Sequence, residues 1–324
     1  MRLDGQFHLE ARGHRISLDR SGSRAHACFV SHAHSDHISA LKNPDNRVIA
    51  SPETLALAGF GSKPVESLDG LKLSLLPSGH MLGSSQLRVE CDGKAFTYTG
   101  DFKLGKSLTC KEAEVQETDE LMIEGTFGDP SYSFPEREEA YAQIAEFASR
   151  RYNEGHIVIL GGYSLGKAQE LVAVVNKYCG LKPITQGKIA RACKIYSEFG
   201  FPLSFAEIGA PEAEELMRSN FVAVLPFHQV NFELAVKLSK QYKRSVYTAV
   251  ATGWAGRMRL PVDKAFPLSD HADFKNILEY VERARPKRIH CCHGNEERLS
   301  HELQKRGWAA SPAAEAMQTR VSSW

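Results

Sequence analysis

Four side chains that can bind a metal ion lie within six residues near the N-terminus, in the segment from His32 to His37. This segment follows a strand-like run. Side chains alternate along an extended chain, so His32, His34 and Asp36 are expected on one side of it. His37, where the chain turns, can then face a second ion. Imidazole suits zinc, and mixed imidazole and carboxylate ligands leave a position for water. The segment therefore predicts half of a two-metal site.

Further candidate ligands follow other strand-like segments. His80, Asp101 and His293 each come directly after such a segment, at the end of a sheet where ligands converge. Together with the first segment they supply five histidines and two aspartates. That set is enough for two ions of four or five coordination if Asp101 bridges them. Taken singly, Asp101 could be a turn residue and His80 could cap a loop, so the prediction rests on the combination.

Composition indicates a globular protein. The chain has 324 residues, 42% of them hydrophobic, which is enough for a sizeable core. Its apolar runs are too short to span a bilayer, and the N-terminus lacks the apolar region of a signal peptide. Seven cysteines without a Cys-x-x-Cys pair fit a reducing compartment. We therefore expect a cytoplasmic protein that does not bind membranes. The formal net charge of +1 means that any polyanion would need a local basic patch.

The elements that must position these residues change in character along the chain. Residues 1–127 read as short strands separated by turns. Residues 128–250 instead alternate longer helices and strands, beginning with a predicted helix over 135–153. Residues 251–324 return to the first pattern. This order predicts one domain, 1–127 and 251–324, interrupted by an inserted α/β domain at 128–250.

The motifs resemble those of the metallo-β-lactamase superfamily. The resemblance rests on Asp19 in Ser-Leu-Asp, the segment from His32 to His37, His80 in Ser-Gly-His, and Asp101 in Gly-Asp. Their order and spacing match the family throughout. The resemblance implies an αββα sandwich. It also implies that Asp19 accepts a hydrogen bond from a metal-binding imidazole, a role that suits a carboxylate at a strand end.

Three later motifs resemble the β-CASP nuclease branch of that superfamily. They contain Glu124 in Ile-Glu-Gly-Thr-Phe-Gly, His271 in Ser-Asp-His-Ala-Asp, and His293 in His-Gly. That branch inserts a domain between the glutamate and the second of these motifs, where the pattern above predicts an insertion. The resemblance thus implies an α/β protein: an αββα metallo-β-lactamase sandwich with an inserted α/β β-CASP domain.

The resemblance also implies a ligand set and a mechanism. One zinc would bind His32, His34, His80 and Asp101, and a second would bind Asp36, His37, Asp101 and His293, with Mn²⁺ as the alternative metal. A water bridging the two ions would be deprotonated near neutral pH and attack phosphorus, while the ions neutralise developing charge.

Three residues are expected to be catalytic: Asp36, His271 and Glu124. We interpret His271 as the proton donor to the leaving oxygen and Glu124 as the carboxylate that keeps it charged. His271 could alternatively cap a helix, and Asp270 and Asp273 beside it are interpreted as caps.

A glycine-rich stretch matches the sequence pattern of a nucleotide-binding loop. Gly161 to Lys167 fits the Gly-x-x-x-x-Gly-Lys pattern between a predicted strand and helix, but Ala168 stands where a hydroxyl would hold magnesium. ATP binding is therefore not expected. Glycines at a helix N-terminus still favour an anion, so Ser164, Gly166 and Lys167 are predicted to seat a substrate phosphate. The alternative is a tight strand-to-helix turn.

A second candidate contact with nucleic acid combines Trp254 with Arg257 and Arg259, which suits base stacking and phosphate binding. Trp254 could equally belong to the core. This stretch and the Gly-Lys-Ala-Gln run at 166–169 resemble ligase-associated DNA exonucleases and archaeal mRNA 3′-end processing factor-like proteins. The resemblance favours DNA ends over RNA and implies DNA ligase or repair proteins as partners.

These features predict a two-zinc phosphodiesterase that trims DNA ends as an exonuclease in repair. An RNA-processing exonuclease or endonuclease of the same family is the first alternative. A thioester or lactam hydrolase is the second, although such chemistry needs neither the inserted domain nor the pair of Glu124 and His271. A nucleic-acid-binding subunit without activity is the third.

Overall fold

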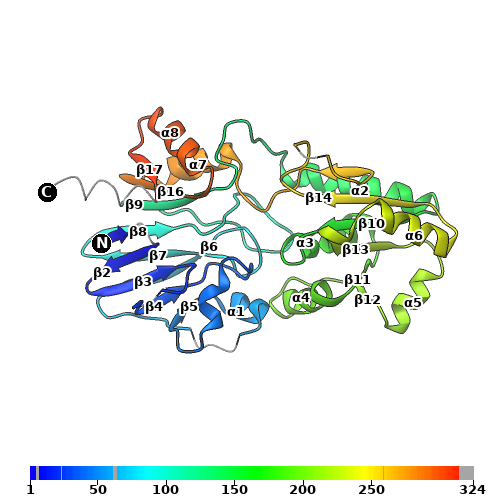
Figure 1. The fold of residues 1–324 in the computed structure, drawn as a ribbon, viewed down its shortest axis with the longest axis horizontal. Coiled ribbons are helices and arrows are strands. Elements are labelled where there is room, and N and C mark those ends of the chain that lie inside the picture. The colour runs from blue at the N-terminus through cyan, green and yellow to red at the C-terminus, as the bar shows by residue number, and fades with distance from the viewer. Residues whose placement is uncertain (5–6, 23, 61–63, 258, 314–324) are drawn as a thin grey trace. The chain divides into compact units, whose positions relative to one another are not determined.

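The chain divides into two structural units in a computed structural model that describes residues 1–4, 7–22, 24–60, 64–257 and 259–313 (Figure 1). Unit 1 consists of Met1–Gly105, Lys111–Ser133 and His271–Trp324, and unit 2 consists of Lys106–Cys110 and Phe134–Asp270. Unit 2 is therefore inserted within unit 1. It extends beyond the predicted boundary at residue 250, because the strand Lys264–Phe266 pairs with the strand Val246–Ala251 of the same unit.

Within the described residues, unit 1 contains two sheets. The strands of the first are β1 (Arg2–Asp4), β2 (His8–Ala11), β3 (His14–Leu18), β4 (Ala27–Phe29) and β5 (Val48–Ile49). The strands of the second are β6 (Lys72–Pro77), β7 (Ser85–Cys91), β8 (Lys94–Tyr98), β9 (Glu120–Gly125), β16 (Arg288–Gly294) and β17 (Ala310–Pro312). The orders are β1-β2-β3-β4-β5 and β17-β16-β9-β8-β7-β6. Strands β9 and β16 are parallel neighbours although far apart in the sequence.

The alternation of strand side chains builds the layers of unit 1. Met122 of β9 joins a core cluster with residues of both sheets, including Phe29 and Val89. Its neighbours Leu121 and Ile123 point the other way and pack with helices α7 (Phe274–Ala284) and α8 (Glu296–Gln304). Helix α1 (Pro52–Ala58) and the 3₁₀ turn Ile38–Lys42 pack on β4 and β5. Unit 1 is thus the predicted αββα sandwich.

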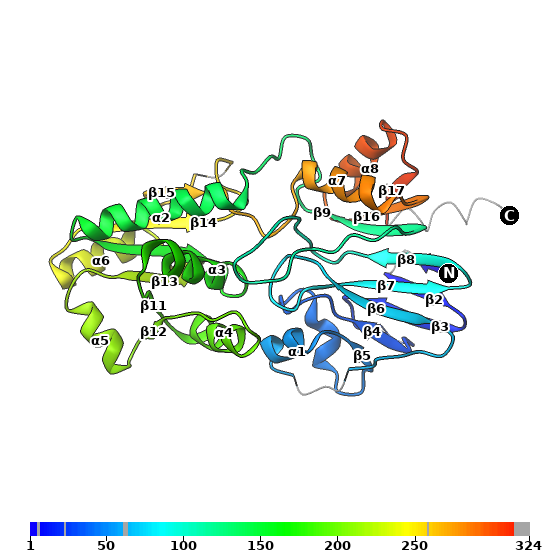
Figure 2. The ribbon, with the colours of Figure 1, turned by 180° about the vertical axis from the view of Figure 1, so that it is seen from behind.

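Unit 2 is built around a parallel sheet (Figure 2). The strands that the structure describes in it are β10 (Ile157–Gly162), β11 (Ile184–Thr185), β12 (Ala206–Glu207), β13 (Val222–Pro226), β14 (Val246–Ala251) and β15 (Lys264–Phe266). Their order is β12-β11-β13-β10-β14-β15. Its helices are α2 (Arg137–Asn153), α3 (Lys167–Val174), α4 (Gly187–Glu198), α5 (Pro211–Met217) and α6 (Phe232–Tyr242).

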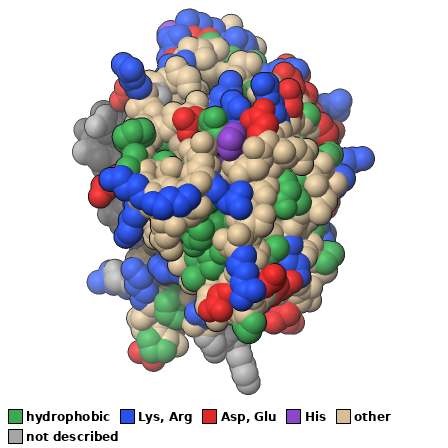
Figure 3. Space-filling model, turned by 90° about the vertical axis from the view of Figure 1, so that its right-hand side faces the viewer, with side chains coloured by type: hydrophobic (Ala, Val, Ile, Leu, Met, Phe, Trp, Pro, Cys, Tyr) green, Lys and Arg blue, Asp and Glu red, His purple; other side chains and the backbone are tan. Residues whose placement is uncertain are grey.

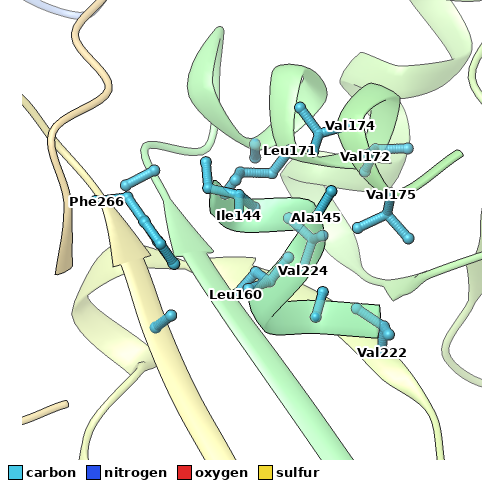
Figure 4. Close-up of a cluster of buried hydrophobic side chains, with 14 of the residues drawn as sticks. Ile144, Ala145, Leu160, Leu171, Val172, Val174, Val175, Val222, Val224 and Phe266 are labelled. Carbon is cyan, nitrogen blue, oxygen red and sulfur yellow. The ribbon is translucent and has the colours of Figure 1, made fainter. Parts of the chain in front are cut away.

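Both faces of this sheet are covered, so its central strands are apolar along their length. Val158 and Leu160 of β10 belong to the core shared with α2, α3 and α4, part of which Figure 4 shows around Leu160, Leu171 and Val224. Ile157 and Ile159 face the opposite core, which includes side chains of α5 and α6. The predicted α/β module is therefore a doubly wound domain.

Side chains of both charge signs occur on the face of the molecule that Figure 3 shows. The face drawn in Figure 3 carries Lys and Arg side chains interspersed with Asp and Glu, in keeping with a net charge of +1. Among the described helices, none is both long and apolar enough to cross a bilayer.

Candidate metal centre and proton donor

The histidine-rich segment follows β4 but, contrary to the prediction, it is not extended. Its chain bends at His32 and turns at residues 35–37, where the His37 N–H donates to the His34 carbonyl over 3.0 Å. The turn still brings the rings together. The His32 ring centroid lies 4.7 Å from that of His34 and 4.1 Å from that of His37. The convergence therefore comes from a turn rather than from strand alternation.

His80 lies in the loop between β6 and β7. Its Nε2 is 3.2 Å from His34 Nδ1, which brings the second motif to the first. Gly79 allows this loop to pass close to the segment that follows Asp101: its φ is +77°, and a Cβ there would lie 2.1 Å from the Lys103 carbonyl oxygen. Only glycine fits both conditions. The close approach to Lys103 therefore explains why a glycine precedes His80.

Asp101 follows β8 and lies at the centre of the cluster. Its Oδ2 is 3.5 Å from Nε2 of both His32 and His37, and 3.9 Å from His80 Nε2. The same oxygen is 4.0 Å from His271 Nδ1. Burial raises the pKa of this carboxyl to about 6. A single carboxylate oxygen thus lies within 4.0 Å of four histidine rings, as a bridging ligand would.

The cluster has the donors that a metal ion requires. In the described ranges, His32, His34, His80 and Asp101 each offer one ligand atom, and these atoms lie within 4.8 Å of one another. His32 Nε2 is buried and has no hydrogen-bond partner within the structure as described. Burial and the neighbouring histidines lower the pKa of His32 well below its ordinary value, which favours the neutral form that binds metals. The residues therefore fit a zinc-like ion.

A second ion has two sets of candidate ligands near the same carboxylate. His37 Nε2 lies 3.6 Å from Asp36 Oδ2 and 3.5 Å from Asp101 Oδ2, and the Asp36 side chain is 77% exposed. Asp101, Glu124 and His271 also have one ligand atom each within 4.8 Å of one another. The first set contains predicted ligands. The second consists of Asp101 together with the expected proton donor, His271, and the carboxylate expected to keep it charged, Glu124.

His293 is placed by a buried hydrogen-bond chain that the sequence did not predict. Its Nε2 lies 2.9 Å from the Tyr98 hydroxyl, which donates to Asp19 Oδ2 over 2.8 Å. Its ring centroid is 5.4 Å from that of His37. His293 has φ +57° at a register shift in β16, an uncommon conformation for a residue other than glycine. Tyr98 could have been suspected only from its place at the end of β8, three residues before Asp101.

Asp19 is fully enclosed by donors. Besides Tyr98, it accepts from the Ser31 backbone N–H over 2.6 Å and the Ser31 hydroxyl over 2.7 Å, and it lies 2.9 Å from His37 Nδ1. Burial alone would raise its pKa, but His37 and these hydrogen bonds outweigh burial and lower it. An ionised Asp19 therefore orients His37 through Nδ1 and leaves Nε2 directed at Asp101.

Glu124 and His271 are paired across 147 residues of sequence. His271 Nδ1 lies 3.0 Å and 3.1 Å from the two Glu124 carboxylate oxygens. The Phe102 N–H donates to the same carboxylate over 2.9 Å, and Glu124 is fully buried. Burial alone would raise the pKa of Glu124. The charge and hydrogen bond of His271 outweigh burial, and the net effect is a lowered pKa. An ionised carboxylate thus lies against the His271 ring.

The three residues considered as helix caps, Asp270, His271 and Asp273, differ in their contacts. Asp273 caps α7, because its Oδ1 accepts from the Asn276 N–H over 2.9 Å. Asp270 does not have this position: its carboxylate contacts the amine of Lys167 at 2.5 Å. His271 precedes the cap and contacts Glu124 instead.

The glycine-rich stretch does not offer its lysine to solvent. Lys167 is 1% exposed, and its Nζ lies 2.7 Å from Glu170 Oε2 as well as against Asp270. The Gly166 N–H donates to Gln169 Oε1 over 2.8 Å. The geometry therefore supports the alternative, a tight strand-to-helix turn, and not the phosphate seat predicted at Ser164, Gly166 and Lys167.

Trp254, Arg257 and Arg259 follow β14 in unit 2. Trp254 is half-buried, whereas both arginines are exposed. Residue 258, between the arginines, lies outside the described residues. The two arginines are thus accessible, and their role in binding stays a prediction.

Comparisons with known proteins place this geometry in a family. No family model matches the sequence. It is 30% identical over 311 residues to a probable DNA ligase of Opitutus terrae, covering 87% of this chain and 28% of that protein. It is 30% identical over 203 residues to an RNase J-like protein of Methanocaldococcus jannaschii, covering 53% of this chain and 47% of that protein. The chain thus spans about a quarter and about half of these relatives.

Two more distant matches cover most of the chain. The 5′ exonuclease Apollo of Gallus gallus is 25% identical over 287 residues, which is 83% of this chain and 59% of that protein. A crystal structure of a protein of unknown function from Enterococcus faecalis superimposes with a TM-score of 0.57 at 16% identity, over 90% of this chain and 80% of that one. The chain belongs to the β-CASP branch of the metallo-β-lactamase superfamily. Unit 1 has the sandwich of this fold, and unit 2 is the α/β unit inserted in it.

Proposed function

We propose that this β-CASP protein is a metal-dependent phosphodiesterase that trims nucleic-acid ends, with DNA as its substrate. The observation that carries the proposal is the pair formed by Glu124 and His271 beside Asp101. His271 Nδ1 is 3.0 Å from Glu124 and 4.0 Å from Asp101, so a proton donor lies at the edge of a cluster fit for metal ions. Hydrolysis of a phosphodiester needs both an activated water and a donor to the leaving oxygen.

The proposed ligands of two zinc ions are those that the family resemblance implies, with Asp101 shared. Bound ions would activate water and neutralise charge on the phosphate, with Mn²⁺ as the alternative to zinc. The chain's own task is to hold the donor atoms. Asp19 orients His37 through Nδ1 at 2.9 Å, and Asp36 lies beside the same ring on the solvent side. Asp36 is therefore proposed to bind at the open side of the cluster, where substrate arrives.

His271 is proposed to protonate the leaving oxygen. The fully buried, ionised Glu124 stabilises the charged imidazolium, because a carboxylate within hydrogen-bond distance favours a protonated ring. With Nδ1 directed to Glu124, the proton for transfer is on Nε2. The His271 side chain is 25% exposed, whereas Glu124 is not, so the donor and not its supporting carboxylate can reach a substrate.

The names of the relatives support nucleic acid as the substrate and are compatible with either DNA or RNA. Relatives include a probable DNA ligase and the 5′ exonuclease Apollo, which favour DNA ends and partners in ligation or repair. An RNase J-like protein and the endoribonuclease YSH1 of Kluyveromyces lactis favour the alternative, RNA processing. The greater coverage of this chain by the DNA-related proteins is the reason to propose DNA first.

The function can be tested with end-labelled single- and double-stranded DNA and RNA, each with a 5′-phosphate or a 5′-hydroxyl. We expect ladders of shortened DNA in the presence of Zn²⁺ or Mn²⁺. Replacing the donor, His271→Ala, should slow cleavage by about 100-fold or more. The exposed His301 of α8 offers a matched control, and His301→Ala should cleave normally.

Other outcomes have defined meanings. Cleavage of RNA alone would transfer the proposal to RNA processing. Hydrolysis of a thioester without cleavage of DNA or RNA would overturn it. Unchanged cleavage by His271→Ala would remove this residue from the mechanism.

A further inference from the structure

Unit 2 buries a group of charged side chains that the proposed mechanism does not use. Arg137, Lys167, Glu170 and Asp270 are 5%, 1%, 1% and 9% exposed. Charges are rarely buried unless they are paired, because removing them from water costs several kcal/mol each. The group contains two positive and two negative side chains, so it is neutral as a whole.

The contacts place Lys167 between the two carboxylates. Its Nζ lies 2.7 Å from Glu170 Oε2 and 2.5 Å from Asp270 Oδ1. Arg137 Nε lies 3.6 Å from Glu170 Oε1, to which the Tyr141 hydroxyl also donates. Burial would raise the pKa of Glu170, but Lys167 and Arg137 outweigh it and lower that pKa. Glu170 thus stays charged and fixes the lysine, which in turn holds Asp270.

This arrangement explains a motif that resembles a phosphate-binding loop. The glycines set Lys167 at the first position of α3, pointing into unit 2 rather than at a ligand. A Cβ on Gly162 would lie 2.9 Å from the Lys167 Cγ, so the small residue makes room for the lysine stem. The pattern therefore builds an internal ion pair with Asp270.

Asp270 is the residue directly before the proposed proton donor. Along the chain, unit 2 ends at Asp270 and unit 1 resumes at His271. The residue after the donor is anchored too, because the Ala272 N–H donates to the Phe102 carbonyl over 2.7 Å. Asp270 is thus held within unit 2 by a buried ion pair, and Ala272 is held within unit 1 by a backbone hydrogen bond.

We propose that Lys167 is a positioning residue for His271, acting by holding Asp270 and so fixing the backbone from which the donor projects. The inference rests on the proposed function, in which His271 protonates the leaving oxygen. Small displacements of a proton donor reduce rates strongly, because proton transfer requires hydrogen-bond distance. Loss of Lys167 should therefore reduce the protonation of the leaving group more than it reduces other steps.

The dependence of the rate on the leaving group tests this role. An oligonucleotide loses an alkoxide, which needs a proton, whereas bis(4-nitrophenyl) phosphate loses a nitrophenolate, which does not. We expect Lys167→Met and Asp270→Asn to lower kcat on the oligonucleotide on the order of 10- to 100-fold. The change for the activated ester should be less than about threefold, because the general acid contributes little there.

Two further variants serve as positive and negative controls for this comparison. His271→Ala should show the same leaving-group pattern in a stronger form. Lys182→Met removes a surface lysine of unit 2, whose Nζ is 2.6 Å from Glu212, and should change neither rate. Thermal unfolding of each variant shows whether it is folded, and if Lys167→Met does not fold, the nearly isosteric Asp270→Asn provides the same comparison.

The outcomes separate this inference from the function on which it rests. A wild-type protein that hydrolyses neither substrate contradicts the proposed function. An active wild type whose folded Lys167→Met and Asp270→Asn variants lose both activities equally contradicts the positioning role, and so does normal cleavage of the oligonucleotide by both. Selective loss on the oligonucleotide supports it.

Discussion

At the scale of single residues, one proton determines how His293 can be used. The Tyr98 hydroxyl has a single hydrogen, which it donates to Asp19. Its oxygen must then accept from His293 Nε2, 2.9 Å away, so this nitrogen carries the hydrogen. The other ring nitrogen, Nδ1, keeps a lone pair. Tyr98 therefore selects the tautomer of His293 that would bind an ion through Nδ1.

Removing the Tyr98 hydroxyl should weaken metal binding. Tyr98→Phe leaves the ring in the core but takes away the acceptor for His293 and one donor to Asp19. Loss of such supporting hydrogen bonds typically costs about 10- to 100-fold in metal affinity. Competition for Zn²⁺ with a chromophoric chelator measures the change for the more weakly bound ion.

The matched control is another buried tyrosine of unit 1. Tyr280 in α7 is fully buried, and its hydroxyl donates to Gln86 Oε1 of β7, which is not a proposed ligand. Tyr280→Phe should leave zinc affinity unchanged while costing similar stability. Equal zinc affinities for the two variants would show that Tyr98 does not support the site.

At the scale of elements, the loop between β6 and β7 combines a steric constraint with a proposed ligand. Gly79 precedes His80, has φ +77° and leaves only 2.1 Å between an added Cβ and the Lys103 carbonyl oxygen. The Lys103 N–H in turn donates to the Ser78 carbonyl over 2.9 Å. The close approach at Gly79 and this hydrogen bond hold the loop against the segment that follows Asp101. They thereby set the position of His80.

Gly79→Ala should therefore disrupt this loop. The backbone atom that the new methyl group would meet cannot rotate away, so the loop must move. Gly93, in the turn between β7 and β8, has φ +69° with nothing within 4 Å of an added Cβ, and thus isolates the cost of the left-handed backbone alone. We expect Gly79→Ala to lower the free energy of unfolding by at least about 2 kcal/mol more than Gly93→Ala. Urea denaturation measures both, and equal losses would contradict the clash.

At the scale of the whole molecule, metal binding should stabilise one unit selectively. The proposed ligands all belong to unit 1. A ligand that binds only the folded state adds about 2.7 kcal/mol when present at 100 times its Kd. Zn²⁺ should therefore raise the unfolding temperature of unit 1, and a chelator should lower it.

Amide hydrogen exchange, measured before and after chelation, reports the effect of metal on each unit separately. Amides of β8 and β9 should exchange faster after chelation, whereas those of β10 and β13 in unit 2 should keep their rates. An unchanged exchange rate in unit 1 would count against a bound ion.

Sequence patterns predicted what is local and missed what is distant. The density of metal-capable side chains between His32 and His37 was sufficient to predict a site, and strand and helix periods predicted the inserted domain. The hydroxyl of Tyr98 could not be predicted as a partner of His293, because 195 residues separate them. The Gly-x-x-x-x-Gly-Lys pattern likewise favoured a phosphate, since Asp270, the counter-charge of Lys167, lies 103 residues away. Burial decides such roles, and a linear pattern carries little information about burial.

The parallel pairing of β9 with β16 imposes an order on biosynthesis. Glu120 pairs with Arg288, which lies 168 residues later in the sequence. Strand β9 therefore leaves the ribosome as an edge strand and has no partner on that side until unit 2 has been translated. Edge strands in this state invite pairing with other chains. Unit 2 can fold in the meantime, because its strands follow one another without interruption from β10 to β15. The nascent chain therefore completes its inserted domain before the sandwich that surrounds it, and His293 is among the last of the proposed ligands to arrive.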